Sequence, residues 1–550
     1  MKKFALALFI LMMVLSACAP AATVAPTAEP TTVVTEAPQA QTEEPVAEQP
    51  TKVPPTEAPV VEEPTAAPVF KEITMANGRE GFLLKGNTIE TDDAFPMMGF
   101  GMIEGLTWID FDGNLAPKLA VSWTQVDDLT WEFKLRTGVF FQNGEPFNAA
   151  AVVKSLEYIR NAPTPPRGFT ATTFDSAEAI GEDTVRIHTA TPDMLMPNRL
   201  SAPNAGILAP SAYIAESGPI DPFGTGTGPF TLTELMPEQY MVLEKNPNYW
   251  GGPVTLDKVT VLYIPDMTIK AGMLQNGEII ASTQIPTEQL PILENIPGLV
   301  TYVIAEPRTV SLHFNMQKEV LQDIRIRQVI GYAIDKQGIV DAILEGYGVA
   351  GKGVITDVEA WQNLDVMGLP YDPEKAAALL AEAGYEPGAL TLQIATYTAR
   401  TYLPPVAVAL QDMLGKVGIN VEVRIAVYES LLKDLQAGNY DMFILARSHV
   451  LDTYDPEGFF TSDYTCAGTF NWDYYCNEEF DALLAQAKTL SDPQARYEIY
   501  YQLQSIIDSD VVGVHLFYTG NAGGYWDTLL NFREHPLGRG TLYPELDVAP

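Results

Sequence analysis

The sequence FGTGTGPF (Phe223–Phe230) is a first candidate for chemistry, because glycine-rich turns often cradle phosphate groups. A phosphate-binding P-loop needs Lys and then Ser or Thr after its last glycine, whereas Gly228 is followed by Pro229 and Phe230. A dinucleotide site needs a helix here, but the next residues, FTLTEL, alternate between apolar and polar and predict a strand. The loop is therefore not a nucleotide site, and we expect Gly226 and Gly228 to allow tight backbone turns.

Other catalytic patterns are also missing from the sequence. The five histidines are His188, His313, His449, His515 and His535. None of them belongs to an HExxH pair, and the chain has no GxSxG nucleophile motif. The 70 Asp and Glu residues are too many for counting to exclude an acid–base pair, but most must form a solvated surface. A metal site needs several converging ligands, and we expect neither a metal nor another cofactor.

Cys466 and Cys476 are the only cysteines besides Cys18. Outside the cytoplasm, a pair of cysteines ten positions apart is most simply a disulfide. Closing so small a loop would stabilise the fold by about 3 kcal/mol in the chain-entropy treatment. A metal site with two cysteines is the alternative, but no histidine lies close to them in the sequence.

The first residues, MKKFALALFILMMVLSAC, have the form of a secretory signal peptide at residues 1–17. Lys2 and Lys3 are basic, and the apolar run Phe4–Leu15 is shorter than the roughly 20 residues that span a bilayer. The sequence LSAC at its end resembles the lipobox of bacterial lipoproteins, which implies cleavage before Cys18 and lipid attached to that residue. The alternative is an ordinary signal peptide followed by an incidental cysteine.

The chain after Cys18 divides into a linker and a large body. Residues 18–70 are rich in Pro, Thr, Ala and Glu, which predicts a disordered tether. The remaining residues, about 480 in number, are too many for one hydrophobic core and should split into two or more lobes. The net charge of −37 argues against binding to nucleic acid or to anionic lipid.

Four blocks of the body resemble bacterial extracytoplasmic solute-binding proteins of family 5, the peptide- and nickel-binding type. The most specific block is GTGTGPFTLTELMPEQYMVLEKNPNYWGG at 224–252, where a GTGPF loop leads into a strand and then into NPxYWGG. The others occupy 104–159, 311–348 and 470–487, in the order of the family.

The resemblance implies an α/β fold of the periplasmic-binding-protein type (type II), with two lobes that enclose the ligand and one inserted domain. The boundaries that we predict are domain I at 71–105, 221–308 and 512–550, domain II at 106–220, and domain III at 309–511.

The residues themselves favour alternating strands and helices. Leu129–Leu135 alternates as a strand does, and Asn148 is a good N-cap for the apolar-faced helix that follows it. Asp323–Ile343 has helical spacing, and a further helix should begin at Pro373 and stop at Gly384.

The resemblance also implies ligand-binding residues. In peptide-binding members an aspartate three positions before a D/E-P pair binds the ammonium of the peptide, and Asp452 stands three before Asp455-Pro456. Dipeptide-binding relatives have an arginine for the ligand carboxylate after a strand, where this chain has Arg400. The alternatives are a turn residue for Asp452 and a surface ion pair for Arg400, whose surroundings depart from the family at Pro404 and Pro405.

His449 stands where peptide and nickel binders commonly have tryptophan, so it could contact a metal chelate or be an ordinary hydrogen-bonding residue. A sugar ligand would instead stack on aromatic rings such as those of Tyr428, Tyr454 and Trp472, and we include Tyr454 among the candidate ligand-binding residues.

These features together predict a lipid-anchored, monomeric receptor of an ABC importer on the extracytoplasmic side of the membrane. It would capture a small solute, for which a di- or oligopeptide is the first choice, and deliver it to ABC permease and ATPase subunits. Oligosaccharide and metal-chelate ligands, a surface enzyme acting on peptide or glycan, and a signalling receptor are the alternatives. The extracytoplasmic side is a periplasm or the outer face of a single membrane.

Overall fold

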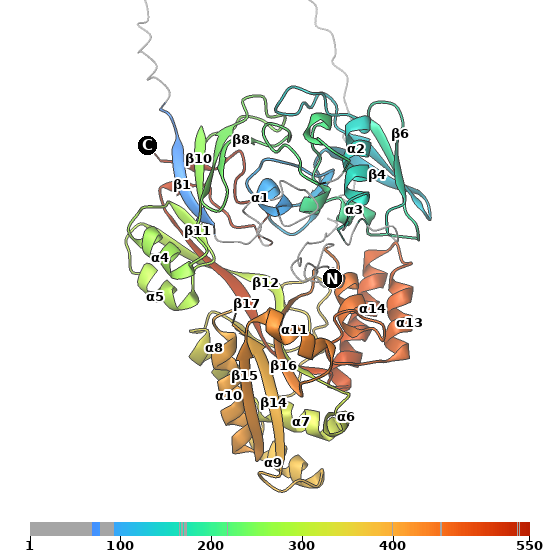
Figure 1. Cartoon of the computed structure of the whole chain (residues 1–550), viewed down its shortest axis with the longest axis vertical. Coiled ribbons are helices and arrows are strands. Elements are labelled where there is room, and N and C mark those ends of the chain that lie inside the picture. Colours follow the sequence, from blue (N-terminus) through green and yellow to red (C-terminus); the bar gives the residue numbers. More distant parts are fainter. Residues whose placement is uncertain are drawn as a thin grey trace, which may run out of the picture.

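The computed structural model describes residues 69–77, 93–163, 165–166, 169, 173–216, 218–398, 400–450, 454–535, 537 and 539–549. These residues form an upper and a lower lobe that are joined by two long strands (Figure 1). The predicted signal peptide, Cys18, the linker up to residue 68 and Asp452 lie outside the described residues. Within the described ranges, no helix combines the length and the apolar character that crossing a bilayer requires.

An 11-stranded mixed sheet extends through both lobes in the order β15-β14-β16-β12-β17-β11-β1-β10-β9-β8, with β13 paired to β17 outside this path. Its strands in the upper lobe are β1 (Glu72–Asn77), β8 (Phe230–Met236), β9 (Tyr240–Lys245), β10 (Lys258–Tyr263) and β11 (Ala281–Thr283). Its strands in the lower lobe are β13 (Val349–Ala350), β14 (Leu390–Tyr397), β15 (Ile419–Ala426) and β16 (Met442–Ser448). The two strands that belong to both lobes are β12 (Leu299–Phe314) and β17 (Gly513–Trp526).

The strands β12 and β17 are antiparallel partners across the lobe boundary (Figure 1). In the upper lobe Leu299–Ala305 pairs with 520–526, and in the lower lobe residues 309–313 pair with 513–518. The register shifts between Ala305 and Thr309, so the regular ladder is interrupted between its two halves. This interruption makes the crossing point the natural place for the lobes to move relative to one another.

The rest of the upper lobe surrounds a second sheet of four antiparallel strands in the order β4-β5-β7-β6. These strands are β4 (Ala120–Asp127), β5 (Thr130–Leu135), β6 (Ser176–Ala179) and β7 (Thr184–His188). Two short ladders pair β2 (Thr107–Ile109) with β3 (Leu115–Pro117), and β18 (Leu529–Leu530) with β19 (Asp547–Val548). The helices are α1 (Ala94–Gly99), α2 (Ala149–Arg160), α3 (Met196–Arg199), α4 (Met267–Gln275) and α5 (Leu290–Leu293), with 3₁₀ turns at Pro203–Ala205, Pro210–Ala212 and Thr287–Gln289.

The glycine-rich loop packs against the backbone of the segment that follows α1. A Cβ at Gly226 would lie 2.0 Å from the carbonyl oxygen of Met102, and one at Gly228 would lie 2.2 Å from that of Gly101. Among the three glycines of the loop, only Gly224 has a positive φ, at 67°. The prediction that Gly226 and Gly228 allow tight turns was therefore wrong. These two glycines instead permit the close approach of another backbone segment, and the left-handed turn is made by Gly224.

The loop and the NPNYWGG sequence meet at one buried carboxylate, that of Glu104. Thr227 Oγ1 donates to Glu104 at 2.8 Å, Tyr249 OH at 2.8 Å and Trp250 Nε1 at 2.6 Å. Lys118 Nζ lies 3.1 Å from the same carboxylate. Because Glu104 is only 4% exposed, these donors satisfy a charge that would otherwise be costly to bury. The two motifs thus meet in the core of the upper lobe.

The lower lobe surrounds its half of the central sheet with helices (Figure 1). They are α6 (Glu319–Gln322), α7 (Ile324–Ala333), α8 (Lys336–Ile343), α9 (Pro373–Glu382), α10 (Leu403–Lys416), α11 (Tyr428–Gln436), α12 (Glu457–Tyr464), α13 (Glu478–Ala487) and α14 (Pro493–Ser509). One hydrophobic cluster lies beneath the sheet, and a second is formed by α12, α13 and α14.

Several sequence expectations agree with these elements. Asn148 accepts a hydrogen bond from Ala151 N at the start of α2, and Pro373 opens α9 with Gly384 in the left-handed conformation after it. The helical run Asp323–Ile343, however, is two helices and not one. Asp335 breaks it because its carboxylate accepts a hydrogen bond from Gly338 N, which is the N-cap interaction that begins α8.

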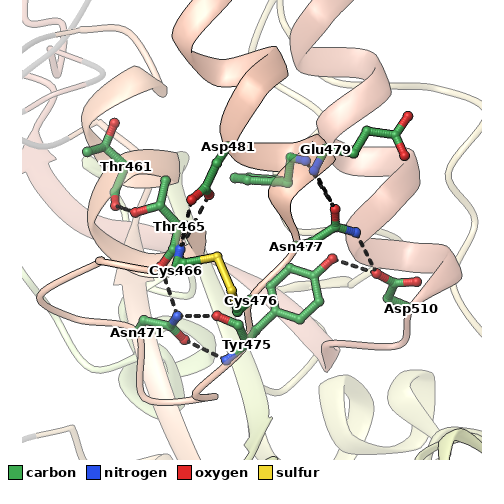
Figure 2. Close-up of a disulfide and its surroundings, with 11 residues drawn as sticks. Thr461, Thr465, Cys466, Asn471, Tyr475, Cys476, Asn477, Glu479, Asp481 and Asp510 are labelled. Carbon is green, nitrogen blue, oxygen red and sulfur yellow. Dashed lines mark hydrogen bonds between the residues drawn. A yellow bond between two sulfur atoms is a disulfide. The ribbon is translucent and has the colours of Figure 1, made fainter.

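The disulfide loop closes against the lower-lobe sheet (Figure 2). Cys466 and Cys476 are joined in the structure, with 4.4 Å between their Cα atoms. Inside the loop, the carboxylate of Asp473 accepts from Phe314 N at 2.8 Å and lies 2.8 Å from His313 Nδ1. The loop therefore ties the end of β12 to the helices α12 and α13.

A buried glutamate lies beside the crossing strands. Glu534 is 8% exposed, and Tyr302 OH on β12 donates to it at 3.0 Å. Burial raises the pKa of Glu534 to about 7, and the nearby Glu306 adds to the effect, although the Tyr302 hydrogen bond opposes it.

We predict that Glu534 makes the protein less stable as the pH rises. Its pKa is higher in the folded chain than the ordinary value of 4.5, so its stabilising contribution is complete below about pH 4.5 and is lost as the pH rises through about 7. Between low and high pH, the free energy of unfolding should change by up to about 3 kcal/mol less in Glu534→Gln than in the wild type, as judged from the size of the pKa shift. Urea denaturation of both proteins between pH 4.5 and 8 measures it.

The exposed Glu498 on α14 offers a matched control, and Glu498→Gln should leave the pH profile as in the wild type. Parallel profiles for wild type and Glu534→Gln would show that Glu534 does not titrate in this range.

Candidate functional site

The carboxyl ends of β14, β15 and β16 share one edge of the sheet, because these strands are parallel neighbours. That edge lies at the lobe boundary, since Ser448 at the end of β16 pairs with Arg308 in the crossing segment of β12. Arg400 follows β14 by three residues, and His449 follows β16 directly. In open α/β sheets, ligands bind outside the carboxyl ends of the strands, so this edge is the candidate site.

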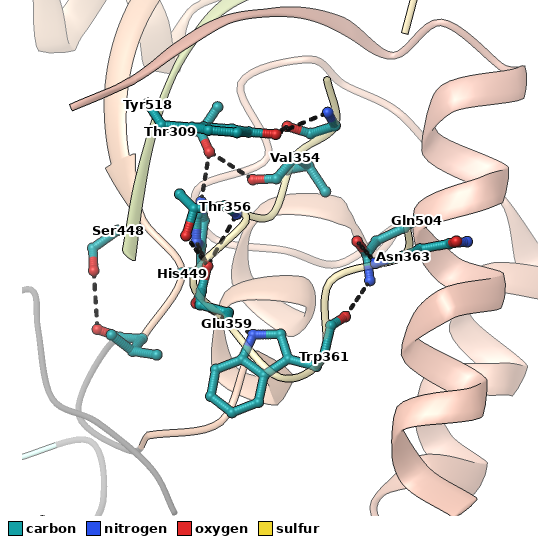
Figure 3. Close-up of polar contacts among 12 residues, drawn as sticks. Thr309, Val354, Thr356, Glu359, Trp361, Asn363, Ser448, His449, Gln504 and Tyr518 are labelled. Carbon is teal, nitrogen blue, oxygen red and sulfur yellow. Dashed lines mark hydrogen bonds and ion pairs between the residues drawn. The ribbon is translucent and has the colours of Figure 1, made fainter. Parts of the chain in front are cut away.

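His449 lies inside the lower lobe, with no exposed side-chain surface (Figure 3). Its Nδ1 is 2.6 Å from Glu359 Oε2, and its Nε2 is 2.8 Å from Thr309 Oγ1. The Thr309 hydroxyl donates to the carbonyl of Val354 at 2.8 Å. One hydroxyl has one hydrogen, so Thr309 cannot donate to Val354 and to His449 at once, and His449 and Glu359 form a buried hydrogen-bonded pair.

Glu359 accepts further hydrogen bonds from its own loop. Thr356 donates to it from its backbone N at 3.0 Å and from its hydroxyl at 2.8 Å, and Trp361 Nε1 donates at 3.2 Å. Asn363 continues the loop and is held by Gln504 on α14 (Figure 3). The network therefore fastens the loop 354–363 between the sheet and α14.

The hydroxyl of Thr309, the imidazole of His449 and the carboxyl of Glu359 are connected in the same order as the groups of a catalytic triad. Their role here is structural and not catalytic. The hydroxyl of Thr309 is engaged with Val354, and Thr309 is only 2% exposed. Because His449 is fully buried with both nitrogens engaged, its predicted contact with a ligand does not fit its position. The side chain instead fixes the start of the segment that leads to Asp452 and Tyr454.

Asp455 fixes the other end of that segment. It is 2% exposed and accepts hydrogen bonds from Arg496 Nη2 at 3.0 Å and from the hydroxyl of Tyr500. It also accepts from Glu457 N at 3.0 Å, at the beginning of α12. Residues 451–453, which include Asp452, are outside the described residues.

Tyr454 is half-buried and lies at the contact between the lobes. Its ring packs edge-on against Trp361, with 5.1 Å between the ring centroids. Its carbonyl oxygen accepts from Asn198 Nδ2 of the upper lobe at 3.2 Å. Burial raises the pKa of the Tyr454 phenol, so the side chain stays neutral.

Arg400 is partly exposed at the same sheet edge, and its Nη1 donates to Tyr402 OH at 3.4 Å. Burial lowers the pKa of its guanidinium, but favourable interactions with Tyr402, Tyr397 and the crossing residue Glu306 outweigh this effect and raise the pKa. Pro404 and Pro405 lie in the first turn of α10, where a missing N–H costs no helix hydrogen bond. The departure from the family pattern therefore leaves the helix intact.

The aromatic residues considered for a sugar ligand lie in different environments. Trp472 is buried at 7% exposure in the sheet core, so it offers no open face for a pyranose. Tyr428 begins α11 and contacts the ring of Tyr397 at 5.4 Å. Among the described residues, no three side chains of His, Cys, Asp or Glu are grouped as a metal site requires.

The sequence did not point to Glu359, Trp361, Asn198 or Arg199, although each of them contacts or neighbours the segment 449–457. Glu359 and His449 are 90 positions apart, and Asn198 and Tyr454 are 256 apart. No local pattern links residues so distant in the chain.

We predict that His449→Leu destabilises the protein by about 3–5 kcal/mol, because it leaves the buried carboxyl of Glu359 without its partner. Adding Glu359→Gln should recover part of the loss, since the uncompensated charge is gone. Urea denaturation gives both values. His188→Leu is the matched control, because His188 faces Glu178 at 3.5 Å on the surface and should cost less than about 1 kcal/mol. A loss for His449→Leu as small as the control would contradict the buried pair.

Comparison with known proteins identifies relatives along most of the chain. The glutathione-binding protein GsiB of Escherichia coli strain K12 is 29% identical over 458 residues, which cover 79% of this chain and 88% of GsiB. The structure of NikA from Brucella suis in complex with Fe(III)-EDTA has a TM-score of 0.77 at 23% identity, over 87% of this chain and 100% of NikA. The oligopeptide-binding protein AppA of Bacillus subtilis, in complex with a nonapeptide, has a TM-score of 0.69 at 22% identity, over 88% of this chain and 100% of AppA.

These structures confirm the α/β fold of the periplasmic-binding-protein type that the sequence predicted. The matching family is one of solute-binding proteins, and GsiB is a glutathione-binding protein, which confirms that the chain is a binding protein and sets aside the alternative of a surface enzyme. Residues 114–471 match the middle region of a family of extracellular proteins. The chain belongs to the bacterial extracellular solute-binding proteins, family 5.

Proposed function

We propose that this protein is the lipid-anchored solute receptor of an ABC importer and that it binds a small peptide or peptide-like solute between its lobes. The observation that carries the proposal is the shared sheet edge at the lobe boundary, where Arg400 follows the end of β14 and Tyr454 contacts the upper lobe. Lipid on Cys18 would hold the monomeric receptor near its permease and ATPase subunits, and the sequence of the signal peptide supports this part.

The charges around this edge suit a zwitterionic ligand. The guanidinium of Arg400 can hold a carboxylate with two parallel hydrogen bonds, and Asp452 can hold an ammonium group. GsiB is named for glutathione, a peptide-like molecule with one ammonium group and two carboxylates. Glutathione and dipeptides are therefore the first solutes to test.

Native mass spectrometry of the intact protein tests the ligand class directly, because the mass of a co-purified molecule identifies it. A peptide or glutathione mass is the expected result. A hexose-based mass or a nickel chelate would replace the peptide class, and NikA shows that a relative with this fold binds a metal chelate.

We predict that Asp452→Asn and Arg400→Gln each weaken the binding of glutathione or of the best dipeptide by about 2–5 kcal/mol, the usual cost of leaving one buried charge without its partner. Isothermal titration calorimetry measures this loss. Asp365→Asn makes the same change of charge at an exposed position of the lower lobe and should not alter the affinity. Unchanged affinity in Asp452→Asn would remove this residue from the site.

We further propose that Cys466 and Cys476 are oxidised in the mature protein, because the compartment is extracytoplasmic and both side chains are exposed. Cys466→Ala with Cys476→Ala should lower the free energy of unfolding by about 3 kcal/mol, as expected for a short closed loop. Thiol titration of the unfolded wild type gives the oxidation state, and urea denaturation gives the stability. Two free thiols in protein taken from the cell envelope would refute the disulfide.

A further inference from the structure

Tyr454 of the lower lobe touches the upper lobe at two separate points. Its carbonyl oxygen accepts a hydrogen bond from Asn198 Nδ2 of α3 at 3.2 Å. Its hydroxyl lies against Gly113, in the turn between β2 and β3, where a Cβ would come within 3.2 Å of the oxygen. Gly113 is buried, whereas its neighbour Asp112 is exposed. The two lobes therefore meet closely at this tyrosine.

The two elements of the upper lobe that receive Tyr454 are fastened to each other. Thr107 Oγ1 on β2 donates to the carbonyl of Pro197 on α3 at 2.6 Å, and Thr107 has no exposed surface. The turn after β2 is closed by Asp110, whose carboxylate accepts a hydrogen bond from Asn114 N at 2.7 Å. The turn and the helix thus present one preformed surface to the tyrosine.

Tyr454 is also held firmly within its own lobe. Its ring packs edge-on against Trp361, which is only 1% exposed, with 5.1 Å between the ring centroids. The next residue, Asp455, is buried and accepts a hydrogen bond from Arg496 Nη2 at 3.0 Å. Tyr454 therefore cannot follow the upper lobe when the lobes part, and both of its contacts with that lobe must break.

Glycine suits position 113 for two reasons. The φ of Gly113 is 82°, in the left-handed region that favours glycine. A larger residue would also direct its side chain at the hydroxyl of Tyr454, because even its first carbon would be only 3.2 Å from that oxygen. The close fit exists only while the lobes are together. A contact that exists in one of two states shifts the equilibrium toward that state.

We propose that Asn198 and Gly113 are positioning residues for solute capture: they receive Tyr454 and hold the lobes together at a point outside β12 and β17. The role requires no contact between these two residues and the solute. It rests on the proposed capture of a solute between the lobes, but not on which solute the protein binds.

The test measures the separation of the lobes in the intact protein without added solute. Spin labels on a ketone-bearing amino acid in place of Thr124 on β4 and Ala485 on α13, both exposed, report this distance by double electron–electron resonance and leave the three cysteines unchanged. Asn198→Ala should reduce the ratio of closed to open molecules about fivefold, as expected for one lost hydrogen bond. Gly113→Leu should reduce it about tenfold, within the usual range of coupling between sites, because the added side chain meets Tyr454.

Gly138→Leu is the matched control. Gly138 also belongs to the upper lobe and has a positive φ, at 75°, but a Cβ there would meet no described atom within 4 Å. The backbone strain is thus alike, and the closed fraction should stay as in the wild type. In a Tyr454→Ala background, Gly113→Leu should have no further effect, because the hydroxyl that its side chain meets is gone.

An unchanged closed fraction in Gly113→Leu would overturn the proposal. An equal loss in Gly138→Leu would also overturn it, because the effect would then belong to backbone strain. If Gly113→Leu does not fold, Asn198→Ala and Tyr454→Ala carry the test, and an unchanged closed fraction in both would be the contrary result. Failure of glutathione and dipeptides to bind would count against the proposed ligand and not against this inference.

Discussion

The pairing of β12 with β17 in both lobes is the constraint on which the rest of the structure depends. About half of each strand lies in the upper lobe and half in the lower lobe, so both lobes share the same pair of strands (Figure 1). The ladder holds the lobes at a fixed distance along the strands, while the shift of register between Ala305 and Thr309 interrupts it at the boundary. A pair of strands whose ladder is interrupted at the boundary allows rotation but resists sliding. This geometry brings the carboxyl ends of β14, β15 and β16 beneath the upper lobe.

Buried polar networks then fix the parts that the ladder does not reach. In the upper lobe Glu104 collects donors from two distant motifs. In the lower lobe Glu359 and His449 hold a loop and the end of β16 together. Each network satisfies its charge inside the protein, where an unpaired group would be costly. The described residues on either side of 451–453, which are His449 and Asp455, are therefore both held by buried polar contacts.

The sequence predicted local structure well where one residue determines it. The alternation in FTLTEL became β8, and the cap at Asn148 became the start of α2. It failed at Asp335, because an apolar helical spacing continues through a residue whose side chain begins a new helix. The candidate site was predicted only in part. Arg400 and Tyr454 lie at the lobe boundary, whereas His449 turned inward because its partner, Glu359, comes from a loop 90 positions away that local pattern cannot reveal.

The central claim is that the solute lies between the lobes at the carboxyl ends of the parallel strands and is held there without being altered. A crystal structure of the intact protein with glutathione, or with whichever dipeptide binds it best, tests this claim most directly. The account predicts intact solute between Arg400 and the segment 451–454, with both lobes in contact with it. Solute bound elsewhere on either lobe, or a cleaved product at this position, would contradict the account.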